Sequence, residues 1–365
     1  MREAPERLRR LPEQYFTALL ARVAAAAAGE GEPLVDLGRG NPEVGPPPHV
    51  VEALAACAAR PDVHGYAPFA GLPALKEAIA ARYRDLYGVE LDPAREVAVL
   101  PGSKTGLMEF ALCAVERGGT IVLPDPGYPD YFSAVALAGA RHAPFDDFSM
   151  PGDAMYLNYP TNPTATAAPD GVFDDAVAWA ERNDAWVIHD FAYGDLVFDG
   201  RTPQSFLAAD GARDVGIELF SMSKSYGMAG WRLGFALGNA ELVRRIEAVQ
   251  DHAFAGIFRP VQEAGIAALT GPQESVAERR ASYEGRRNRT LTALDGLEAR
   301  SEGTFFVWFR LPDRVSVEQL LTEQRVAVAP GEGFGARGAG WARLSLAVTD
   351  ANLDAGLERL ARALH

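Results

Sequence analysis

The amino-acid sequence predicts an α/β protein, built on a mostly parallel, doubly wound sheet and followed by a smaller α+β C-terminal domain. The first observation is an alternation, from about residue 95, of short β-rich runs with helical stretches, which is typical of such a sheet. The second is the length of 365 residues, which is close to that of two domains. The third is the composition, with 48% hydrophobic and 23% charged residues, as in ordinary globular proteins.

The elements follow in order along the chain. Strands of the sheet are expected at 97–100, 120–123, 154–158, 185–189, 218–221 and 233–237. Helices are expected between them, among others at 105–115, 170–183 and 240–253. The last part of the chain differs, because strands expected at 304–311, 326–329 and 342–348 stand beside helices expected at 317–323 and 351–364. This mixture predicts the smaller α+β domain.

Glycine and proline cluster at 38–48, ahead of a helix expected from His49, and this cluster indicates a crossing between domains. We therefore expect residues 1–45 to form an N-terminal arm and part of the small domain. Residues 46–255 are expected to form the large domain, which holds the ligand, and residues 256–365 the C-terminal small domain.

Charge and cysteine content exclude several classes of function. The net charge is 35 − 49 = −14, which disfavours non-specific binding to nucleic acid or to anionic membranes. Two cysteines, Cys57 and Cys113, cannot form a disulfide framework, and the six histidines show no metal-ligand spacing. No apolar run is long enough to span a bilayer, and the charged start lacks a signal-peptide core. We expect a cytoplasmic protein without a metal, acting on small molecules.

Lysine occurs only at Lys76, Lys104 and Lys224, so chemistry that needs an amine has three candidates. Lys76 lies in an amphipathic helical stretch and is expected to face solvent. Lys104 opens a helix, and its side chain is open to two interpretations, towards a phosphate or towards solvent. Lys224 follows a buried strand, where a desolvated amine is suited to forming a Schiff base.

Polar residues stand where the expected strands end. In an open α/β sheet, ligands bind beyond the carboxyl ends of the strands. The segments that follow these ends are 101–106, 125–129, 159–164, 190–193 and 221–224, and they hold the least generic residues of the chain. Five polar ends on one rim predict a sizeable polar ligand.

The chemistry of that ligand follows in part from these residues. A helix that begins at Ser103 after Gly102 offers free N–H groups to a phosphate. Three side chains suit the same phosphate, namely Ser221, Ser223 and Arg232.

Two further residues point to a charged aromatic ring. Asp190 at a buried strand end needs a cationic partner, and Tyr128 between Gly127 and Pro129 suits stacking on a flat ring. A phosphate, a ring with a protonated nitrogen and an aldehyde for Lys224 together describe pyridoxal 5′-phosphate.

The motifs that carry a family resemblance are Ser221-Met222-Ser223-Lys224 with Gly230-Trp231-Arg232-Leu233-Gly234, preceded by Asn162-Pro163-Thr164 and Asp190-Phe191-Ala192-Tyr193. On these motifs the chain resembles the fold-type-I pyridoxal-phosphate aminotransferases of class I/II, from about residue 11 to its end. The stretches at 102–104, 125–129, 157–160 and 330–335 look most like bacterial LL-diaminopimelate aminotransferase-type sequences. The resemblance implies an aspartate aminotransferase-like fold.

The resemblance also implies roles for single residues. Lys224 would form the Schiff base with the cofactor and shuttle the proton, Asp190 would pair with the pyridinium nitrogen, and Tyr193 with Asn162 would bond the 3-oxygen of the ring. Phosphate contacts would come from Ser103, Lys104 through its backbone, Ser221, Ser223 and Arg232, and the ring would stack on Tyr128. Tyr66 would reach the phosphate of a neighbouring subunit, which implies a homodimer.

On the substrate side, the resemblance implies that Arg343 grips the α-carboxylate, as a planar guanidinium does bidentately, and that Asn162 and the Gly40 backbone lie near the same group. Arg39 is unexpected between two glycines. Either Arg39 or Arg259 is a candidate for binding a second carboxylate. The alternative, surface arginines among the 35 − 3 = 32 of the chain, stays open.

The activity implied is an aminotransferase that works by a ping-pong mechanism between an α-amino acid and a 2-oxo acid. Glutamate and 2-oxoglutarate form one candidate pair, with a diaminopimelate-like or other amino acid opposite. The alternatives are a pyridoxal-phosphate lyase or decarboxylase and, more weakly, a ligand-binding regulatory module. Two departures from the family bear on local geometry: Ala165 stands where a glycine is usual, and the segment 145–155 is short. The literal GxGxxG at 333–338 precedes a strand and so fails the dinucleotide test.

Overall fold

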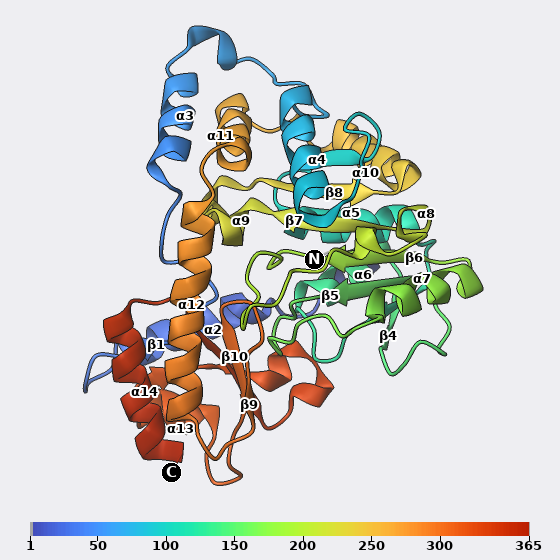
Figure 1. Ribbon diagram of the computed structural model, residues 1–365. Helices are drawn as coiled ribbons and strands as arrows, with labels where there is room; N and C mark the ends of the chain where they lie inside the picture. The colour runs from blue at the N-terminus through green and yellow to red at the C-terminus, as the bar shows by residue number, and fades with distance from the viewer. Residues whose placement is uncertain (1–2, 365) are drawn as a thin grey trace.

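The computed structural model describes residues 3–364 and has a seven-stranded sheet at its centre (Figure 1). The strand order is β2-β8-β7-β6-β5-β3-β4, and β8 alone runs antiparallel to its neighbours. The bounds are β2 Val97–Leu100, β3 Thr120–Leu123, β4 Arg141–Pro144, β5 Ala154–Asn158, β6 Trp186–Asp190, β7 Gly216–Ser221 and β8 Gly234–Gly238. The mostly parallel sheet is confirmed, and the six expected strands lie where predicted, with ends shifted by at most two residues.

Strand β4 was not predicted. Its sequence, Arg-His-Ala-Pro, has no apolar run, and its side chains are mostly exposed. It pairs only with β3 at the edge of the sheet, where a short polar strand discourages pairing with other chains.

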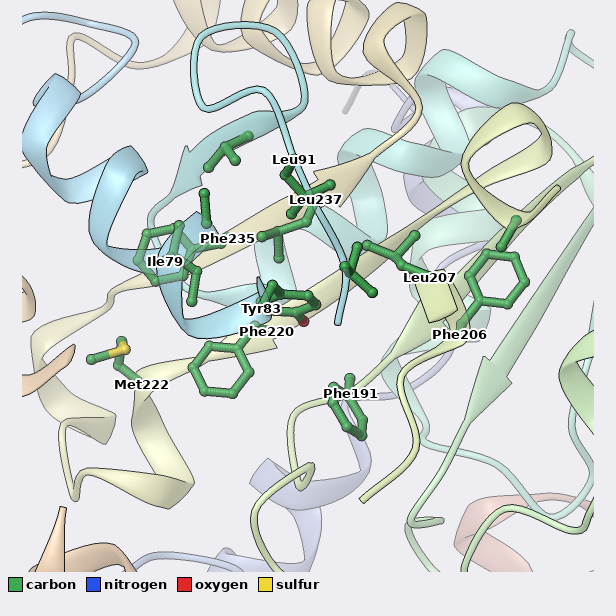
Figure 2. Close-up of a cluster of buried hydrophobic side chains, with 14 of the residues drawn as sticks. Ile79, Tyr83, Leu91, Phe191, Phe206, Leu207, Phe220, Met222, Phe235 and Leu237 are labelled. Carbon is green, nitrogen blue, oxygen red and sulfur yellow. The ribbon is translucent and has the colours of Figure 1, made fainter. Parts of the chain in front are cut away.

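Helices cover both faces of the sheet, which is why its strands are nearly continuous apolar runs. On one face the side chains of Ala154 and Tyr156 pack with α5 (Ser103–Ala114), α6 (Asp130–Ala138) and α10 (Ala240–Ala253). On the other face Met155 and Leu157 pack with α4 (Pro73–Tyr87), α7 (Val172–Asn183) and α11 (Arg259–Thr270). Figure 2 shows part of this second cluster, with Ile79 of α4 beside Phe235 of β8.

A second, antiparallel sheet has the order β12-β13-β10-β9. Its strands are β9 Ala299–Arg300, β10 Phe306–Arg310, β12 Ala329–Pro330 and β13 Trp341–Ser345. Its core includes residues of α12 (Glu274–Ala293) and α14 (Asp350–Leu364), and Figure 1 shows these two helices side by side. The strand expected at 326–329 is divided, because β11 (Val326–Ala327) instead pairs in parallel with β1 (Val35–Asp36).

The remaining helices are α1 Glu6–Arg9, α2 Tyr15–Ala27, α3 Pro48–Ala58, α8 Ala212–Val215, α9 Met222–Ser225 and α13 Val317–Thr322. Short 3₁₀ turns are η1 Pro61–Val63, η2 Phe206–Ala208, η3 Ala229–Trp231, η4 Gly331–Phe334 and η5 Ala336–Gly338. Helix α2 packs Leu19 and Val23 against Trp308 and Phe334, so the N-terminal segment lies on the small sheet, beside β10 in Figure 1.

The expectation that Lys76 faces solvent is wrong. Its side chain is 8% exposed, and Nζ lies 2.6 Å from Oε1 of Glu247. Glu247 belongs to α10, so this face of α4 is closed by a segment far along the sequence, which the local helical pattern does not reveal. His189 is fully buried in the large sheet, with Nδ1 2.7 Å from Oε2 of Glu218.

The glycines of the GxGxxG stretch serve close packing. A Cβ at Gly333 would lie 1.9 Å from the ring of Tyr15, and one at Gly335 would lie 2.1 Å from Oδ1 of Asp125. The stretch forms η4 and η5 ahead of β13, so it does not open a helix. Within residues 3–364, no helix combines the length and apolar character needed to cross a membrane.

A buried carboxyl on α5 leads to a stability prediction. Glu109 is 3% exposed and accepts one hydrogen bond, from Nε2 of Gln250 at 3.1 Å. Burial raises the pKa of Glu109 to about 7, so the folded protein holds this proton where the unfolded chain has lost it. As the pH rises from the unfolded pKa through 7, the folded state therefore loses stability relative to the unfolded state.

We expect Glu109→Gln, which removes that charge, to raise the free energy of unfolding at pH 8 by about 1 to 3 kcal/mol. The gain should fall to a few tenths of a kcal/mol, roughly RT ln 2, at pH 4.5, where the folded state holds the proton and the unfolded chain holds it about half of the time. Urea denaturation at the two pH values measures this, with the exposed Glu77→Gln on α4 as the matched control. If Glu109→Gln changed the free energy of unfolding by the same amount at both pH values, the raised pKa of Glu109 would be contradicted.

Candidate active site

A cavity of about 480 Å³ opens at the carboxyl ends of the parallel strands, between the large sheet and the small one. It brings together most of the residues predicted from sequence: Gly40, Arg39, Ser103, Lys104, Tyr128, Asn162, Asp190, Tyr193, Ser221, Ser223, Lys224, Arg232 and Arg343. Two predicted residues, Tyr66 and Arg259, lie outside its lining. The remaining lining residues come mainly from α2 and from the segment 36–41.

One end of the cavity has the form of an anion cradle. Helix α5 begins at Ser103, and the preceding Gly102 has a φ of +90°. A Cβ at Gly102 would lie 2.2 Å from Nη2 of Arg232, so only glycine allows the guanidinium to lie against the start of the helix. The free N–H groups of α5 and the Arg232 charge together suit a phosphate.

The side chain of Lys104 does not turn towards this cradle. It is 54% exposed, and its Nζ lies 2.9 Å from Oδ1 of Asp130. The same oxygen accepts a hydrogen bond from Nε2 of Gln14 at 3.1 Å. Gln14 also caps α2 by accepting from the N–H of Thr17. The first turn of α5 is thus tied through Asp130 to the start of α2.

Lys224 places a weakly basic amine in the cavity. Its Nζ donates to the carbonyl of Gly40 at 3.4 Å and lies 5.1 Å from the centre of the Phe305 ring. Burial lowers the pKa of Lys224 from 10.5 to about 8, and the nearby charges of Arg343 and Arg232 act in the same direction. The neutral form of this amine is therefore accessible near physiological pH, although the charged form still predominates below pH 8.

Asp190 ends β6 as a buried carboxylate. Its Oδ2 accepts from the hydroxyl of Tyr131 at 2.9 Å, and its Oδ1 accepts from the N–H of Ala192 at 3.3 Å. Burial raises the pKa of Asp190, and the Tyr131 hydrogen bond opposes this rise. No ion pair to Asp190 occurs within residues 3–364, so the cationic partner expected from sequence is not a side chain of the described chain. A protonated ring nitrogen fits this position.

Asn158 and Tyr131 were not predicted. Nδ2 of Asn158 donates to the carbonyl of Asp190 at 2.8 Å, and Oδ1 accepts from the N–H of Asn162 at 2.7 Å. Asn158 pairs in register with Asp190, and a polar residue at the end of an apolar strand is the signal that reveals it. Tyr131 stands in the first turn of α6, and nothing in the local sequence marks it.

Arg343 is a cation with 1% exposure in the small sheet. It donates from Nη1 to Oδ1 of Asn162 at 2.7 Å and from Nη2 to the carbonyl of Gly38 at 3.1 Å. Its guanidinium carbon lies 3.8 Å from the centre of the Phe306 ring. Burial lowers the pKa of Arg343 to about 10, so the group stays charged at neutral pH. Its Nε has no partner, and no carboxylate of residues 3–364 pairs with it.

Gly40 permits this arrangement, because a Cβ there would lie 2.8 Å from the Phe306 ring. Ala165, at the position where glycine is usual, adopts a φ of +54°, and its N–H donates to the carbonyl of Thr161 at 2.9 Å. The turn beside Asn162 is therefore formed with alanine in a left-handed conformation. The short segment 145–155 packs on α7, where Nε1 of Trp179 donates to the carbonyl of Met150 at 2.8 Å.

Three of the residues predicted from sequence, Tyr66, Arg259 and Arg39, lie in environments that differ from one another. Tyr66 is 88% exposed on the loop before α4. Arg259 opens α11 and pairs with Glu263 at 3.3 Å, away from the cavity, so within this chain it does not face a substrate. Arg39 is exposed at the cavity wall, without an ion pair or hydrogen bond to the described residues.

A half-buried amine, a buried carboxylate and an anion cradle at the strand ends of this α/β fold define the class of pyridoxal-phosphate enzymes. The chain belongs to the family described as aminotransferase class I and II, whose model matches residues 32–360. It is a pyridoxal-phosphate-dependent aminotransferase, and its relatives do not support the lyase alternative.

Named relatives agree with this assignment. The chain is 43% identical to L-glutamine–4-(methylsulfanyl)-2-oxobutanoate aminotransferase of Bacillus subtilis (strain 168), over 97% of this chain and 95% of that protein. It is 38% identical to LL-diaminopimelate aminotransferase of Moorella thermoacetica, over 100% of this chain and 99% of the relative. The substrate-bound BacF structure from Bacillus subtilis has a TM-score of 0.92 at 36% identity, and the match covers 99% of this chain and 98% of that one.

Proposed function

We propose that this cavity carries out both half-reactions of an amino transfer between an α-amino acid and a 2-oxo acid, with the residue roles given below. The observation that carries the proposal is that Lys224, Asp190 and Arg343 line one cavity, where Asp190 and Arg343 are buried, Lys224 is half-buried, and neither Asp190 nor Arg343 is ion-paired to the described chain. When bound, pyridoxal phosphate supplies an aldehyde that accepts the amino group and a ring that withdraws electrons.

Lys224 is the residue that holds the cofactor aldehyde and moves the proton. Its pKa of about 8 makes the neutral amine accessible, and a neutral amine is both a nucleophile and a base. In each half-reaction this amine takes a proton from one of two carbons, the substrate Cα and the cofactor C4′, and returns it to the other.

The residues proposed to contact the cofactor form separate groups, each of which binds a different part of it. Asp190 keeps the ring nitrogen protonated and is itself held by Tyr131. Asn162 and Tyr193 bond the 3-oxygen, and Tyr128 stacks on the ring. The phosphate is held by Ser103, the Lys104 backbone, Ser221, Ser223 and Arg232. On the substrate side, Arg343 binds the α-carboxylate with its planar fork, next to Asn162 and the Gly40 backbone.

A homodimer is part of this proposal. Tyr66 is 88% exposed, and it shares its face of the molecule with other exposed apolar side chains, of which Phe69 lies 6.4 Å from it between ring centres. The neighbouring loop at Gly256 packs close to the carbonyls of Ala67 and Pro68, and Phe254 and Phe258 on it are 40% and 48% exposed. An exposed apolar surface of this kind supports subunit contact, with Tyr66 reaching the partner's phosphate. The cytoplasmic location stays a prediction.

The names of the relatives give different substrates, namely glutamine, LL-diaminopimelate, and glutamate with pyruvate. Glutamate and glutamine are the amino donors that these names contain. We propose glutamate or glutamine as the amino donor.

The visible absorption spectrum of the purified holoenzyme tests the proposed activity. We expect a yellow band that bleaches when the amino donor is added and returns when a 2-oxo acid follows. A band that stays unchanged with every amino acid would contradict amino transfer. A protein that gains no band after addition of pyridoxal phosphate would contradict the role of Lys224.

A further inference from the structure

Arg82 of helix α4 is a buried cation that the proposed function does not use. Its side chain is 7% exposed and forms an ion pair with Asp195, whose side chain is 8% exposed. Among residues 3–364, no other cation pairs with Asp195. Each of the two charges therefore depends on the other, because a buried charge without a partner is strongly destabilising. Neither residue lines the cavity, so neither touches the cofactor in the proposed function.

A second bond from the same guanidinium reaches a different segment of the chain. Nη1 of Arg82 donates to the hydroxyl of Tyr226 at 3.0 Å, and that hydroxyl donates in turn to Oε1 of Gln273 at 2.8 Å. The guanidinium carbon also lies 5.1 Å from the centre of the Phe220 ring on β7. Because the N–H groups of arginine point in fixed directions, the two bonds hold Asp195 and Tyr226 in one geometry.

Both partners of Arg82 stand two residues after a residue of the active site. Asp195 follows Tyr193, and Tyr226 follows Lys224. Inside the cavity, Nζ of Lys224 lies 5.8 Å from the centre of the Tyr193 ring. Arg82 therefore joins, from outside the cavity, the two segments whose side chains approach each other within it.

Backbone hydrogen bonds stiffen both segments over those two residues. The N–H of Leu196 donates to the carbonyl of Tyr193 at 2.8 Å, so a closed turn spans Asp195. The N–H of Tyr226 donates to the carbonyl of Met222 at 3.3 Å, where α9 ends. A shift of either partner of Arg82 is thus transmitted to the side chain that faces the cavity.

We propose that Arg82 is a positioning residue of the amino transfer, whose two bonds fix the amine of Lys224 relative to the hydroxyl of Tyr193. The inference rests on the proposed function, in which both side chains contact the cofactor. Displacement of a reacting group by about 1 Å can lower a rate about 100-fold. Loosening the two segments would therefore slow proton transfer and weaken cofactor binding. The grip of Arg343 on the α-carboxylate would remain, because Arg343 belongs to the small sheet.

The test compares Arg82→Met with Lys76→Met as the matched control. Lys76 lies on the same helix, its side chain is 8% exposed, and it pairs with Glu247 outside the cavity. Removing either cation breaks a buried ion pair, so both variants should unfold at lower urea concentrations than wild type. Only Arg82→Met should alter the active site.

Two measurements detect that alteration. The first is the single-turnover half-reaction of the holoenzyme, followed by absorbance with the amino acid that bleaches the wild-type band fastest. Arg82→Met should lower the limiting rate about 10- to 100-fold and change the half-saturating amino-acid concentration by less than about twofold. The second is titration of cofactor-free protein with pyridoxal phosphate, where the apparent Kd should rise about tenfold. Lys76→Met should leave both values within about twofold of wild type.

Tyr226→Phe tests the same role with less disturbance, because it removes one hydroxyl and keeps the Arg82–Asp195 pair. We expect its limiting rate to fall about 3- to 10-fold. Combined with Arg82→Met, it should cost little beyond Arg82→Met alone, since both changes cut the same link. If Arg82→Met does not fold, Tyr226→Phe decides by the same criterion.

Limiting rates within about twofold of wild type in folded Arg82→Met and Tyr226→Phe would overturn the inference. Equal losses of rate in Arg82→Met and Lys76→Met would overturn it too, because the loss would then follow from stability alone. A wild type whose absorption band responds to no amino acid would instead contradict the proposed function.

Discussion

Replacing Lys224 by alanine is expected to lower the rate of amino transfer by at least about 1,000-fold while leaving a folded protein that still binds pyridoxal phosphate. The amine would be both the attachment point and the base, so no other group in the cavity replaces it. Lys76 is engaged with Glu247 and Lys104 with Asp130, which leaves no second lysine amine facing the cofactor. Single-turnover kinetics and the absorption spectrum measure the loss.

The pH dependence separates this role from a structural one. Burial sets the pKa of Lys224 near 8, so the fraction of neutral amine reaches one half at about pH 8 and levels off roughly one to two pH units higher. We expect uptake of pyridoxal phosphate by cofactor-free wild type to follow that curve, and the curve to disappear in Lys224→Ala. Lys224→Arg is the matched control, since it keeps the charge and lacks the nucleophile. Activity within tenfold of wild type in Lys224→Ala would remove this residue from the mechanism.

Replacing Arg343 by leucine is expected to lower kcat/KM for amino acids by about 100- to 1,000-fold, because a desolvated carboxylate would lose its charged partner. The contact is made in the bound substrate as well as in the transition state, so KM should rise more than kcat falls. Arg343→Lys should recover little, since an ammonium cannot form the paired bonds of the guanidinium fork.

A second readout accompanies Arg343→Leu. The Arg343 charge is one of the causes that lower the pKa of Lys224. Its removal should move the pH curve for cofactor uptake to higher pH. A KM within twofold of wild type would show that Arg343 does not face the substrate, and an unmoved curve would show that its charge does not lower the pKa of Lys224.

The large sheet could be predicted because its strands are short apolar runs with polar ends. Each strand can therefore be recognised from its own residues. The same polar ends located Asp190, Asn162 and Lys224. The exposed edge strand β4 could not be predicted, because it is a strand through its pairing with β3 and its own composition does not indicate one.

The features that could not be predicted from the sequence depend on tertiary contacts. Tyr131 reaches Asp190 only because α6 packs over the sheet, and Asn158 supports it only through the register of β5 on β6. Lys76 is covered by α10, and the α2 surface enters the cavity because the N-terminal segment packs on the small sheet. The hydrophobic periodicity of a short segment does not indicate which distant segments will pack against it.

The lysine placement described above has a practical consequence. Of the three lysine amines, that of Lys76 is buried in an ion pair, that of Lys224 lies inside the cavity, and Lys104 at the cavity wall has a largely exposed side chain. A chain with 32 arginines and so few lysines is therefore nearly silent to amine-directed chemistry. An isotope or dye attached to amines would report on very few positions, and one of them is the residue whose chemical state changes with every turnover.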